Sequence, residues 1–331
     1  MFIIGSYGIA VFTCVLTMIC WGSWANTQKL ATTPFQLFYW DYGLGVLILA
    51  LIAAFTFGSH GDVGRSFMAD LSQANGTNLG LALISGIIFN LANLLLVAAI
   101  DIAGMSVAFP IAIGLALVLG VIINYLAQPL GNPIFLGFGV ILVTIAMILS
   151  ANAYARMSKT SGNKSKLGII VSLISGVMMG MFFRFVAASM STNFITPEIG
   201  KLTPYTASVI FACGVVLSSF IFNTWMIKKP LNGKPLTGVS YKNLSPYAHF
   251  VGILGGAIWS LGTLLSLLAS DKAGFAISYG LGQGATMIAA LWGVFIWREF
   301  KTAPQGTSWR LTLMFLCYLF GLILIVVSKV A

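Results

Sequence analysis

Two stretches of this chain, residues 85–130 and 255–300, read as copies of each other at an offset of 170 positions and without a gap. The matching segments are GIIFNLANLL (86–95) and AAIDIAGMSVAFPIAIGL (98–115) in the first copy, and GAIWSLGTLL (256–265) and LASDKAGFAISYGLGQGA (268–285) in the second. Each copy is apolar and, at about 20 residues per span, long enough to cross a bilayer twice. The pattern indicates an internal repeat within a membrane protein, which is the sequence signature of secondary transporters.

The composition supports the membrane interpretation along the whole chain. Of the 331 residues, 59% are hydrophobic and 7% are charged, and the mean hydropathy is +0.98. About a quarter of the residues of an ordinary soluble domain are charged. The net charge of +10 does not indicate a nucleic-acid partner, because the sequence contains no basic stripe with interleaved aromatic residues. A soluble protein and a nucleic-acid-binding protein are therefore excluded.

We predict an all-α integral membrane protein with about ten transmembrane helices. The expected spans are 3–24, 35–57, 79–100, 103–126, 133–152, 167–190, 203–227, 247–269, 273–297 and 309–329. Pro34 and Pro204 open the second and seventh spans and also differ by 170 positions. The repeat therefore divides the chain into two five-helix halves, residues 1–152 and 167–331, joined by a basic linker at 153–166.

The odd number of spans in each half predicts the topology. The second half must enter the membrane from the opposite side, which gives a 5+5 inverted repeat. Twelve Lys and Arg residues fall in four connections, against four on the other side; the basic connections are 25–34, 153–166, 228–246 and 298–310. By the positive-inside rule the basic side is cytoplasmic, and both termini of this multi-pass protein are expected outside the cell (inner) membrane.

Asp41, in FYWDYGLG (38–45), is the carboxylate that lies well inside a predicted span. It is about six residues from the start of the second span, or roughly 9 Å deep at 1.5 Å per residue. Ionisable groups in membrane segments are costly and are functional candidates by default. Asp41 is therefore a candidate proton-coupling residue. The alternative is a residue at the headgroup boundary within an aromatic belt of Tyr39, Trp40 and Tyr42.

Arg184 lies in the sixth predicted span, roughly 25 Å from its cytoplasmic end. Asp41 and Arg184 are then near opposite faces of the membrane, so we do not expect them to pair directly. One hypothesis is a charged partner inside the bundle or an anionic or polar substrate. The other is that the long side chain of Arg184 reaches the outer headgroups.

Polar residues recur in both copies of the repeat. Asn90 and Asn93 are spaced i, i+3 and share a helix face. Their counterparts in the second copy are Ser260 and Thr263. Polar residues at matching positions suit a substrate site between the halves. The alternative is hydrogen bonding between packed membrane helices, worth about 0.6 kcal/mol per pair on average.

The ninth predicted span carries a polar face that the fourth lacks. Tyr279, Gln283 and Thr286 follow i, i+4, i+7 spacing, while their counterparts in the first copy are apolar. Packing symmetry does not require this difference, so it favours substrate contact. The alternating glycines at 280, 282 and 284 weaken the helix there. Trp21 and Trp259 are candidates for stacking on a ring or a sugar face.

Other chemistry is not indicated. Asp101 and Asp271 each precede an Ala-Gly step, and we interpret them as helix N-caps. The sequence has no G-x-x-x-x-G-K-[ST] motif for ATP-driven transport. An intramembrane enzyme needs a nucleophile–base or metal constellation, and His60 and His249 lie in or near connections. We therefore predict no catalytic residue, no metal site and no cofactor other than a proton gradient.

At these residues the chain resembles the drug/metabolite transporter superfamily. Within it, residues 255–301 (GGAIWSLGTLLSLLASDKAGFAISYGLGQGATMIAALWGVFIWREFK) are similar to the C-terminal half of ureide permeases and of bacterial glucose/ribose porters, with rhamnose transporters more distant. GSWANTQKL (22–30), FYWDYGLG (38–45) and GMSVAFPI (104–111) look closer to the ureide permeases. On this resemblance Trp21, Asp41, Asn93 and Gln283 match motif positions. The chain departs from both relatives at Thr263, where they carry asparagine.

The resemblance implies proton-coupled uptake of a small neutral polar solute, such as a ureide, nucleobase or nucleoside. A sugar porter and an exporter of the same superfamily are the alternatives. A channel is a further alternative, although repeated halves with a polar centre fit alternating access better. The expected partners are the solute and the lipid bilayer, in a monomer or weak dimer.

Overall fold

The computed structural model describes residues 1–157, 166–236 and 241–331. It contains ten helical segments long and apolar enough to cross a membrane, and the described residues form no sheet beyond one isolated bridge between Met190 and Leu202. The predicted all-α membrane class is therefore confirmed. Residues 158–165 of the expected linker, with Lys159 and Lys164, lie outside the described residues.

The helices follow the predicted order in both halves of the chain. The first half contains α1 (Tyr7–Ser23), α2 (Ala25–Ala31), α3 (Phe35–Phe55), α4 (Phe67–Gln73), α5 (Gly76–Ala103), α6 (Met105–Ala127) and α7 (Pro133–Met157). The second contains α8 (Lys166–Ser189), α9 (Pro204–Lys228), η1 (Tyr241–Asn243), α10 (Pro246–Ala273), α11 (Phe275–Gly282), α12 (Ala285–Leu291), the π-helix η2 (Trp292–Ile296) and α13 (Thr307–Val327).

Two of the boundaries that differ from the prediction have local causes. The first span continues past residue 24, because Trp24 keeps helical dihedral angles and α2 extends it to Ala31. The third span starts at Gly76 rather than at 79, because the side chain of Asn75 caps α5 by accepting a hydrogen bond from the Asn78 amide.

The predicted N-cap role of Asp101 and Asp271 is also wrong. Both residues lie in the last turn of a helix, α5 and α10, and the caps of the next helices are Gly104 and Gly274. The third and eighth spans run to the Ala-Gly step itself, where a glycine with positive φ ends each helix. Asp271 instead forms an ion pair with its neighbour Lys272 at 2.8 Å.

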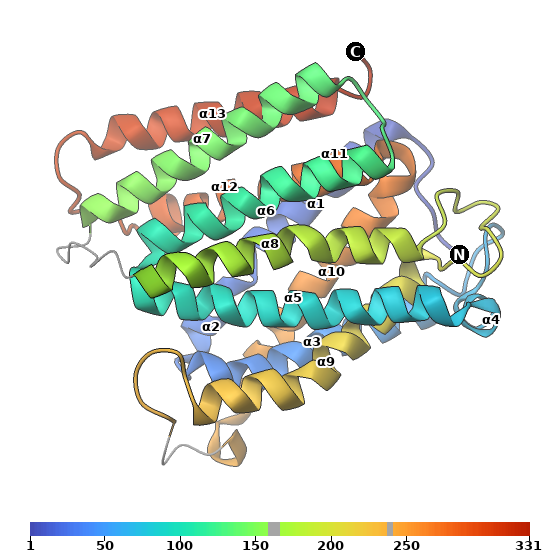
Figure 1. Ribbon diagram of the computed structural model, residues 1–331, viewed down its shortest axis with the longest axis horizontal. Helices are drawn as coiled ribbons and strands as arrows, with labels where there is room; N and C mark the ends of the chain where they lie inside the picture. The colour runs from blue at the N-terminus through green and yellow to red at the C-terminus, as the bar shows by residue number, and fades with distance from the viewer. Residues whose placement is uncertain (158–165, 237–240) are drawn as a thin grey trace.

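Figure 1 shows an elongated bundle with both chain termini at the same end. Helix α5 runs toward the opposite end, whereas α10, its counterpart in the repeat, runs away from it. We call that opposite end the basic end, because its described basic residues outnumber those at the end with the termini. They are Lys29, Arg156, Lys166, Lys228, Lys229, Lys234, Lys242, Arg298, Lys301 and Arg310. The end with the termini carries Arg65, Lys201, Lys272 and Lys329.

Glycines bring two pairs of helices into backbone contact. A Cβ on Gly45 of α3 would overlap the carbonyl of Ile253, and one on Gly256 of α10 would overlap the carbonyl of Tyr42. The pair α5 and α9 has the same arrangement, in which Gly86 faces the carbonyl of Phe211 and Gly214 faces that of Leu83. These contacts correspond between the halves at offsets of 169 and 170 positions.

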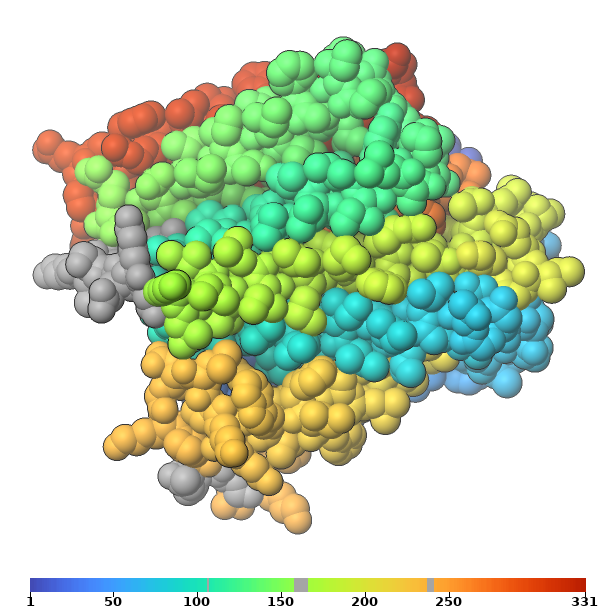
Figure 2. Space-filling view, viewed as in Figure 1, coloured from blue at the N-terminus to red at the C-terminus, as the bar shows by residue number. Residues whose placement is uncertain are grey.

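The outer surface is apolar, as a lipid-facing surface must be. Helices α5, α6, α7 and α8 lie side by side across one face of the molecule (Figure 2). The exposed side chains of α7 include Phe138 and Ile141, and those of α8 include Ile170 and Ile174. In water such a surface would be an aggregation hazard, whereas in a bilayer it contacts lipid.

Candidate functional site

A cavity of about 190 Å³ lies at the centre of the bundle. It is lined by side chains of α1, α5, α6, α8, α10 and the α11–α12 region, and therefore by both halves of the chain. Its aromatic walls are Trp21, Trp24, Phe89, Phe109, Phe182 and Trp259, and its polar lining is Asn93, Gln283 and Thr286. Five predicted site residues thus surround one space: Trp21, Asn93, Trp259, Gln283 and Thr286.

Trp259 is the centre of the aromatic wall. Its ring stacks on Phe89 with centroids 4.1 Å apart and lies nearly parallel to Trp21, at 6.1 Å and 14°. Flat aromatic faces of this kind bind planar solutes by stacking, or the apolar face of a sugar ring. The cavity therefore offers a surface suited to a small ring-shaped solute.

Thr263 holds the tryptophan pair in place and does not line the cavity. The indole Nε1 of Trp21 donates to the Thr263 hydroxyl at 3.2 Å, and that hydroxyl donates to the carbonyl of Trp259 at 3.1 Å. This chain of hydrogen bonds connects α1 to α10. The structure thus places Thr263 behind the cavity wall, between the two tryptophans.

Gln283 lies at a break between two helices. Helix α11 ends at Gly282 and α12 begins at Ala285. At the break the amide of Thr286 donates to the Gln283 carbonyl only three residues back, and so does the Thr286 hydroxyl, at 2.9 Å. Gln283 is 9% exposed, and its side-chain amide makes no hydrogen bond to any described residue. The amide therefore presents a hydrogen-bond donor and an acceptor to the cavity.

Asn93 contributes a second amide from α5. Its Nδ2 donates to the hydroxyl of Tyr39 on α3 at 3.1 Å. Its Oδ1 makes no hydrogen bond within residues 1–157, 166–236 and 241–331. The Tyr39 contact fixes the orientation of the amide, and the carbonyl oxygen remains able to accept from a solute.

Besides Thr263 and Asp41, three predicted site residues lie away from the cavity. Asn90 donates to Ser218 of α9 at 2.7 Å, as expected for bonding between helices. The hydroxyl of Tyr279 donates to the carbonyls of Ala116 and Met179, both at 3.2 Å, in the fully buried interior. Arg184 is half-buried and has no hydrogen bond or ion pair among the described residues.

A larger cavity of about 620 Å³ connects the central cavity to the basic end. The two share part of their lining, namely Gly22, Ala25, Phe109, Thr286 and Ala289. We call this larger cavity the vestibule. Its walls also include Gly104, Met105 and Glu299. The central cavity therefore communicates with the basic end.

Glu299 is tied to two other residues of the vestibule wall. Its carboxylate lies 2.7 Å from Lys29 Nζ and accepts from the Tyr154 hydroxyl at 2.8 Å. Burial alone would raise the pKa of Glu299, but the hydrogen bonds from Lys29 and Tyr154 and the charge of Lys29 outweigh it. The pKa of Glu299 therefore lies below its ordinary value of 4.5.

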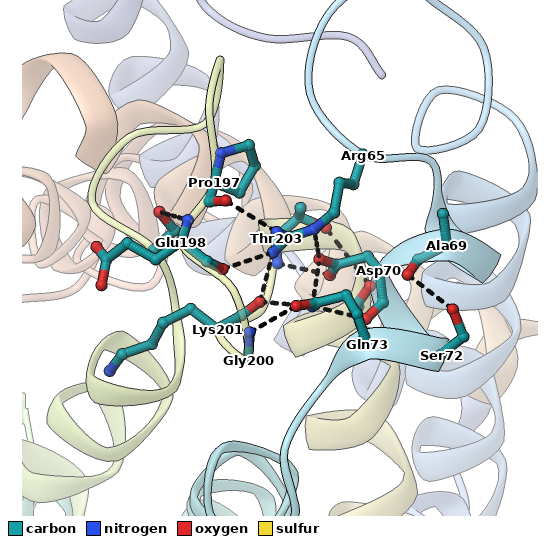
Figure 3. A network of polar contacts seen from close by, with 12 residues as sticks. Arg65, Ala69, Asp70, Ser72, Gln73, Pro197, Glu198, Gly200, Lys201 and Thr203 are labelled. Carbon is teal, nitrogen blue, oxygen red and sulfur yellow. Dashed lines mark hydrogen bonds and ion pairs between the residues drawn. The ribbon is translucent and has the colours of Figure 1, made fainter.

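The end opposite the vestibule is held by a polar network between the halves (Figure 3). Arg65 donates to Asp70 at 2.8 Å and to three carbonyl oxygens of the connection before α9, those of Pro197, Glu198 and Lys201. Asp70 also accepts from the Thr203 amide at 2.7 Å, and its side chain is fully buried. Segments from before α5 and before α9 are thereby joined.

Asp41 lies outside the central cavity, in a separate polar cluster near the basic end. It is 1% exposed. One carboxylate oxygen lies 2.8 Å from Nδ1 of His249 on α10, and the other accepts from the hydroxyl of Tyr241. Burial, then the hydrogen bond to Asp41 and its charge, raise the pKa of Tyr241 above its ordinary value of 10.0. Sequence reasoning missed both partners, since they are 208 and 200 residues away along the chain.

Helix α3 connects this cluster to the central cavity. Tyr42, next to Asp41, packs on Trp24 and Trp259, with ring centroids 4.9 Å and 6.4 Å apart. Tyr39, three residues before Tyr42, accepts a hydrogen bond from Asn93. A movement of α3 would therefore displace side chains that contact the cavity residues Trp24, Trp259 and Asn93.

A bundle of ten spans with a central polar and aromatic cavity that communicates with one end defines a membrane transporter of small solutes. The chain belongs to the sugar transport protein family, whose model matches residues 12–331. Its relatives include ureide permease 1 of Arabidopsis thaliana, 21% identical over 388 residues and covering 99% of each chain. The probable glucose uptake protein GlcU of Priestia megaterium is 27% identical over 329 residues, with 97% of each chain covered. The sequence-based resemblance to ureide permeases and glucose porters is confirmed.

Among solved structures, one described as "Crystal structure of protein" superposes with a TM-score of 0.58. The identity is 13%, and 96% of each chain is covered. This likeness shows the fold alone.

Proposed function

We propose that this protein is a secondary transporter that takes up a small neutral polar solute with a planar amide-containing ring, of the ureide, nucleobase or nucleoside class. The Gln283 side chain carries the proposal. It presents an amide donor and an amide acceptor, without a partner among the described residues, beside the stacked indoles of Trp21 and Trp259. Asn93 adds a second acceptor from the other half of the chain. A ring with both N–H and C=O groups would satisfy these amides while stacking on the tryptophans.

A sugar is the second candidate substrate. The family match and the glucose uptake relatives favour it. An aromatic wall with amide groups also suits a sugar, whose hydroxyls bond to amides and whose apolar face packs on an indole. The two classes differ in stacking area, so a direct comparison of ligands can separate them.

Binding to purified protein is the test of substrate class. Quenching of tryptophan fluorescence would be titrated with allantoin, uracil, ribose, glucose and rhamnose, since three tryptophans line the cavity. Saturable quenching by allantoin or uracil is expected. Its affinity should be about tenfold to a hundredfold lower in Gln283→Ala and unchanged in the surface variant Gln305→Ala. Saturation by the sugars alone would replace the ureide and nucleobase class by the sugar class.

We further propose that a proton gradient drives uptake and that Asp41 is the coupling residue. The carboxylate is buried with His249 and Tyr241, and it lies on the helix that contacts the cavity wall. A carrier needs a group whose charge changes during the cycle, and a carboxylate that moves between buried and solvated surroundings meets this need. The proposal also takes the basic end as cytoplasmic and the two five-helix halves as an inverted repeat.

A further inference from the structure

Two glycine joints occupy corresponding places in the two halves. Gly104 joins α5 to α6, and Gly274 joins α10 to α11. Their backbone angles are nearly the same, with φ 81° and ψ 155° at Gly104 and φ 85° and ψ 156° at Gly274. In the bundle the junction of α5 and α6 lies at the basic end, and the junction of α10 and α11 lies at the other end (Figure 1).

The surroundings of the two joints are different. A Cβ on Gly274 would lie 3.1 Å from Leu130, and the amide of Phe275 donates to Gln128 Oε1 at 3.5 Å. Phe275 is only 3% exposed. The Gly274 joint is therefore packed against the connection between α6 and α7.

The Gly104 joint lies in open space. A Cβ on Gly104 would meet nothing within 4 Å, and Met105, the counterpart of Phe275, is 46% exposed. Both residues line the vestibule. Of the two corresponding joints, the one at Gly274 is thus closed and the one at Gly104 is open.

We propose that the vestibule closes when the joint of Gly104 and Met105 docks on Glu299 and Phe300. The offset of 170 positions makes Phe300 the counterpart of Leu130, which holds the Gly274 joint. Phe300 already packs on Tyr154 in the vestibule wall, with centroids 4.9 Å apart. Docking would bury the exposed Met105 side chain against an aromatic ring, a favourable contact for a thioether.

Glu299 has the side-chain acceptor that this docking needs. At the closed joint Gln128 accepts from the first amide of α11. By the same offset the counterpart of Gln128 is Arg298, which has no acceptor atom in its side chain. We therefore assign the acceptor to its neighbour Glu299, whose carboxylate would meet the first amide of α6. A negative charge is favourable at a helix N-terminus. Lys29 and Tyr154, which hold Glu299 in the present arrangement, would have to release or share it.

The inference rests on the proposed carrier function, because alternating access requires that the two ends do not open together. When the Gly104 joint closes, the Gly274 joint should leave Leu130, and the Arg65–Asp70 network at the same end should separate. The four residues Gly104, Met105, Glu299 and Phe300 would thus form the gate of the basic end.

Disulfide cross-linking tests the gate in the full-length protein. Met105→Cys with Phe300→Cys would be introduced after Cys14, Cys20, Cys213 and Cys317 are replaced by alanine. The matched pair is Phe275→Cys with Leu130→Cys, and each single cysteine variant is a control. A disulfide forms when the Cα atoms come within about 7 Å. Hydrogen exchange at 128–132 and 190–203 then reports the opposite end.

We expect the Met105–Phe300 disulfide to increase hydrogen exchange at 128–132 and 190–203, and the Phe275–Leu130 disulfide to leave these segments protected. Exchange that does not change after the Met105–Phe300 disulfide forms would overturn the gate. If no disulfide forms, the distance between spin labels at positions 105 and 300 is measured instead. A single long distance under all conditions would also overturn the gate. These readouts need no substrate. If the gate responds as expected but none of the tested solutes is taken up, the proposed substrate class is refuted and the gate is not.

Discussion

Asp41 of α3 and His249 of α10 are joined by a hydrogen bond of 2.8 Å within the membrane-spanning bundle. The contact is possible because Gly252 has no side chain; a Cβ at that position would lie 2.5 Å from the Asp41 Cβ. The carboxylate is thus surrounded by a histidine, a tyrosine hydroxyl and helix backbone. The carboxylate is itself buried and has a partner on each oxygen.

Asp41→Asn should abolish accumulation of solute driven by a pH difference while leaving solute binding and exchange largely intact. The substitution keeps the size and hydrogen bonding of the side chain but removes its titration. Uptake into proteoliposomes with and without an imposed pH gradient measures the effect. Asp101→Asn, an exposed carboxylate at the end of α5, is the matched control. Accumulation by Asp41→Asn under a pH gradient alone would show that coupling lies elsewhere.

Gln283→Ala and Asn93→Ala should each weaken solute binding about tenfold to a hundredfold. Losing one hydrogen bond to a buried polar partner costs about 1–3 kcal/mol when that partner is left unpaired, and every 1.4 kcal/mol is about a factor of ten in affinity. Isothermal titration of the purified variants checks the prediction, with Gln305→Ala as the control. If both variants bind as tightly as the original protein, the solute does not contact these amides.

Arg65→Gln should destabilise the protein, because it leaves the fully buried Asp70 without its cationic partner. Removing one member of a buried ion pair costs about 3–5 kcal/mol. The midpoint of thermal unfolding should fall, and hydrogen exchange should rise at 190–203, where Arg65 holds three carbonyl oxygens. Lys329→Gln, at the same end, should change neither quantity. An unchanged midpoint in Arg65→Gln would show that the network contributes little stability.

Acid should weaken the Lys29–Glu299 contact, because the pKa of Glu299 is lowered in the folded protein and its charged form is the stabilised one. A carboxyl group with a lower pKa in the folded state contributes stability above its ordinary value of 4.5 and loses it as the pH falls through the folded-state pKa. Glu299→Gln should therefore be less stable than the original protein near pH 7, and the difference should shrink below pH 4.5. Thermal unfolding at several pH values measures this, and a difference independent of pH would contradict it.

The spans could be predicted from the sequence because bilayer thickness and apolar run length determine them. Trp21, Asn93 and Gln283 could be predicted as well, since each is a polar or aromatic residue within a repeat or motif. The i, i+4, i+7 spacing places Tyr279 on one face with Gln283 and Thr286 only if the helix is continuous. The break between Gly282 and Ala285 interrupts that helix, and Tyr279 points to carbonyls of α6 and α8 instead.

The partners of Asp41 could not be predicted in the same way. Tyr241 and His249 meet Asp41 only because α3 and α10 approach each other at glycines, and that approach depends on tertiary packing rather than on periodicity. The glycines at 45, 252 and 256 were a usable signal for close approach, but they do not reveal which helix is the partner. The helix ends at Gly104 and Gly274 were missed for a similar reason: an acidic residue before a small residue looks like a cap whether the helix starts or ends there.

The glycine contacts between α3 and α10, and between α5 and α9, limit the degrees of freedom of the whole molecule. Backbones that touch at Gly45 and Gly256, or at Gly86 and Gly214, leave no room for a side chain between them. We therefore expect each pair to turn as one rigid block. The relative motion of the blocks is left to the glycine joints and to the break beside Gln283, so the residue proposed to contact the solute lies at one of the few places where the bundle can bend.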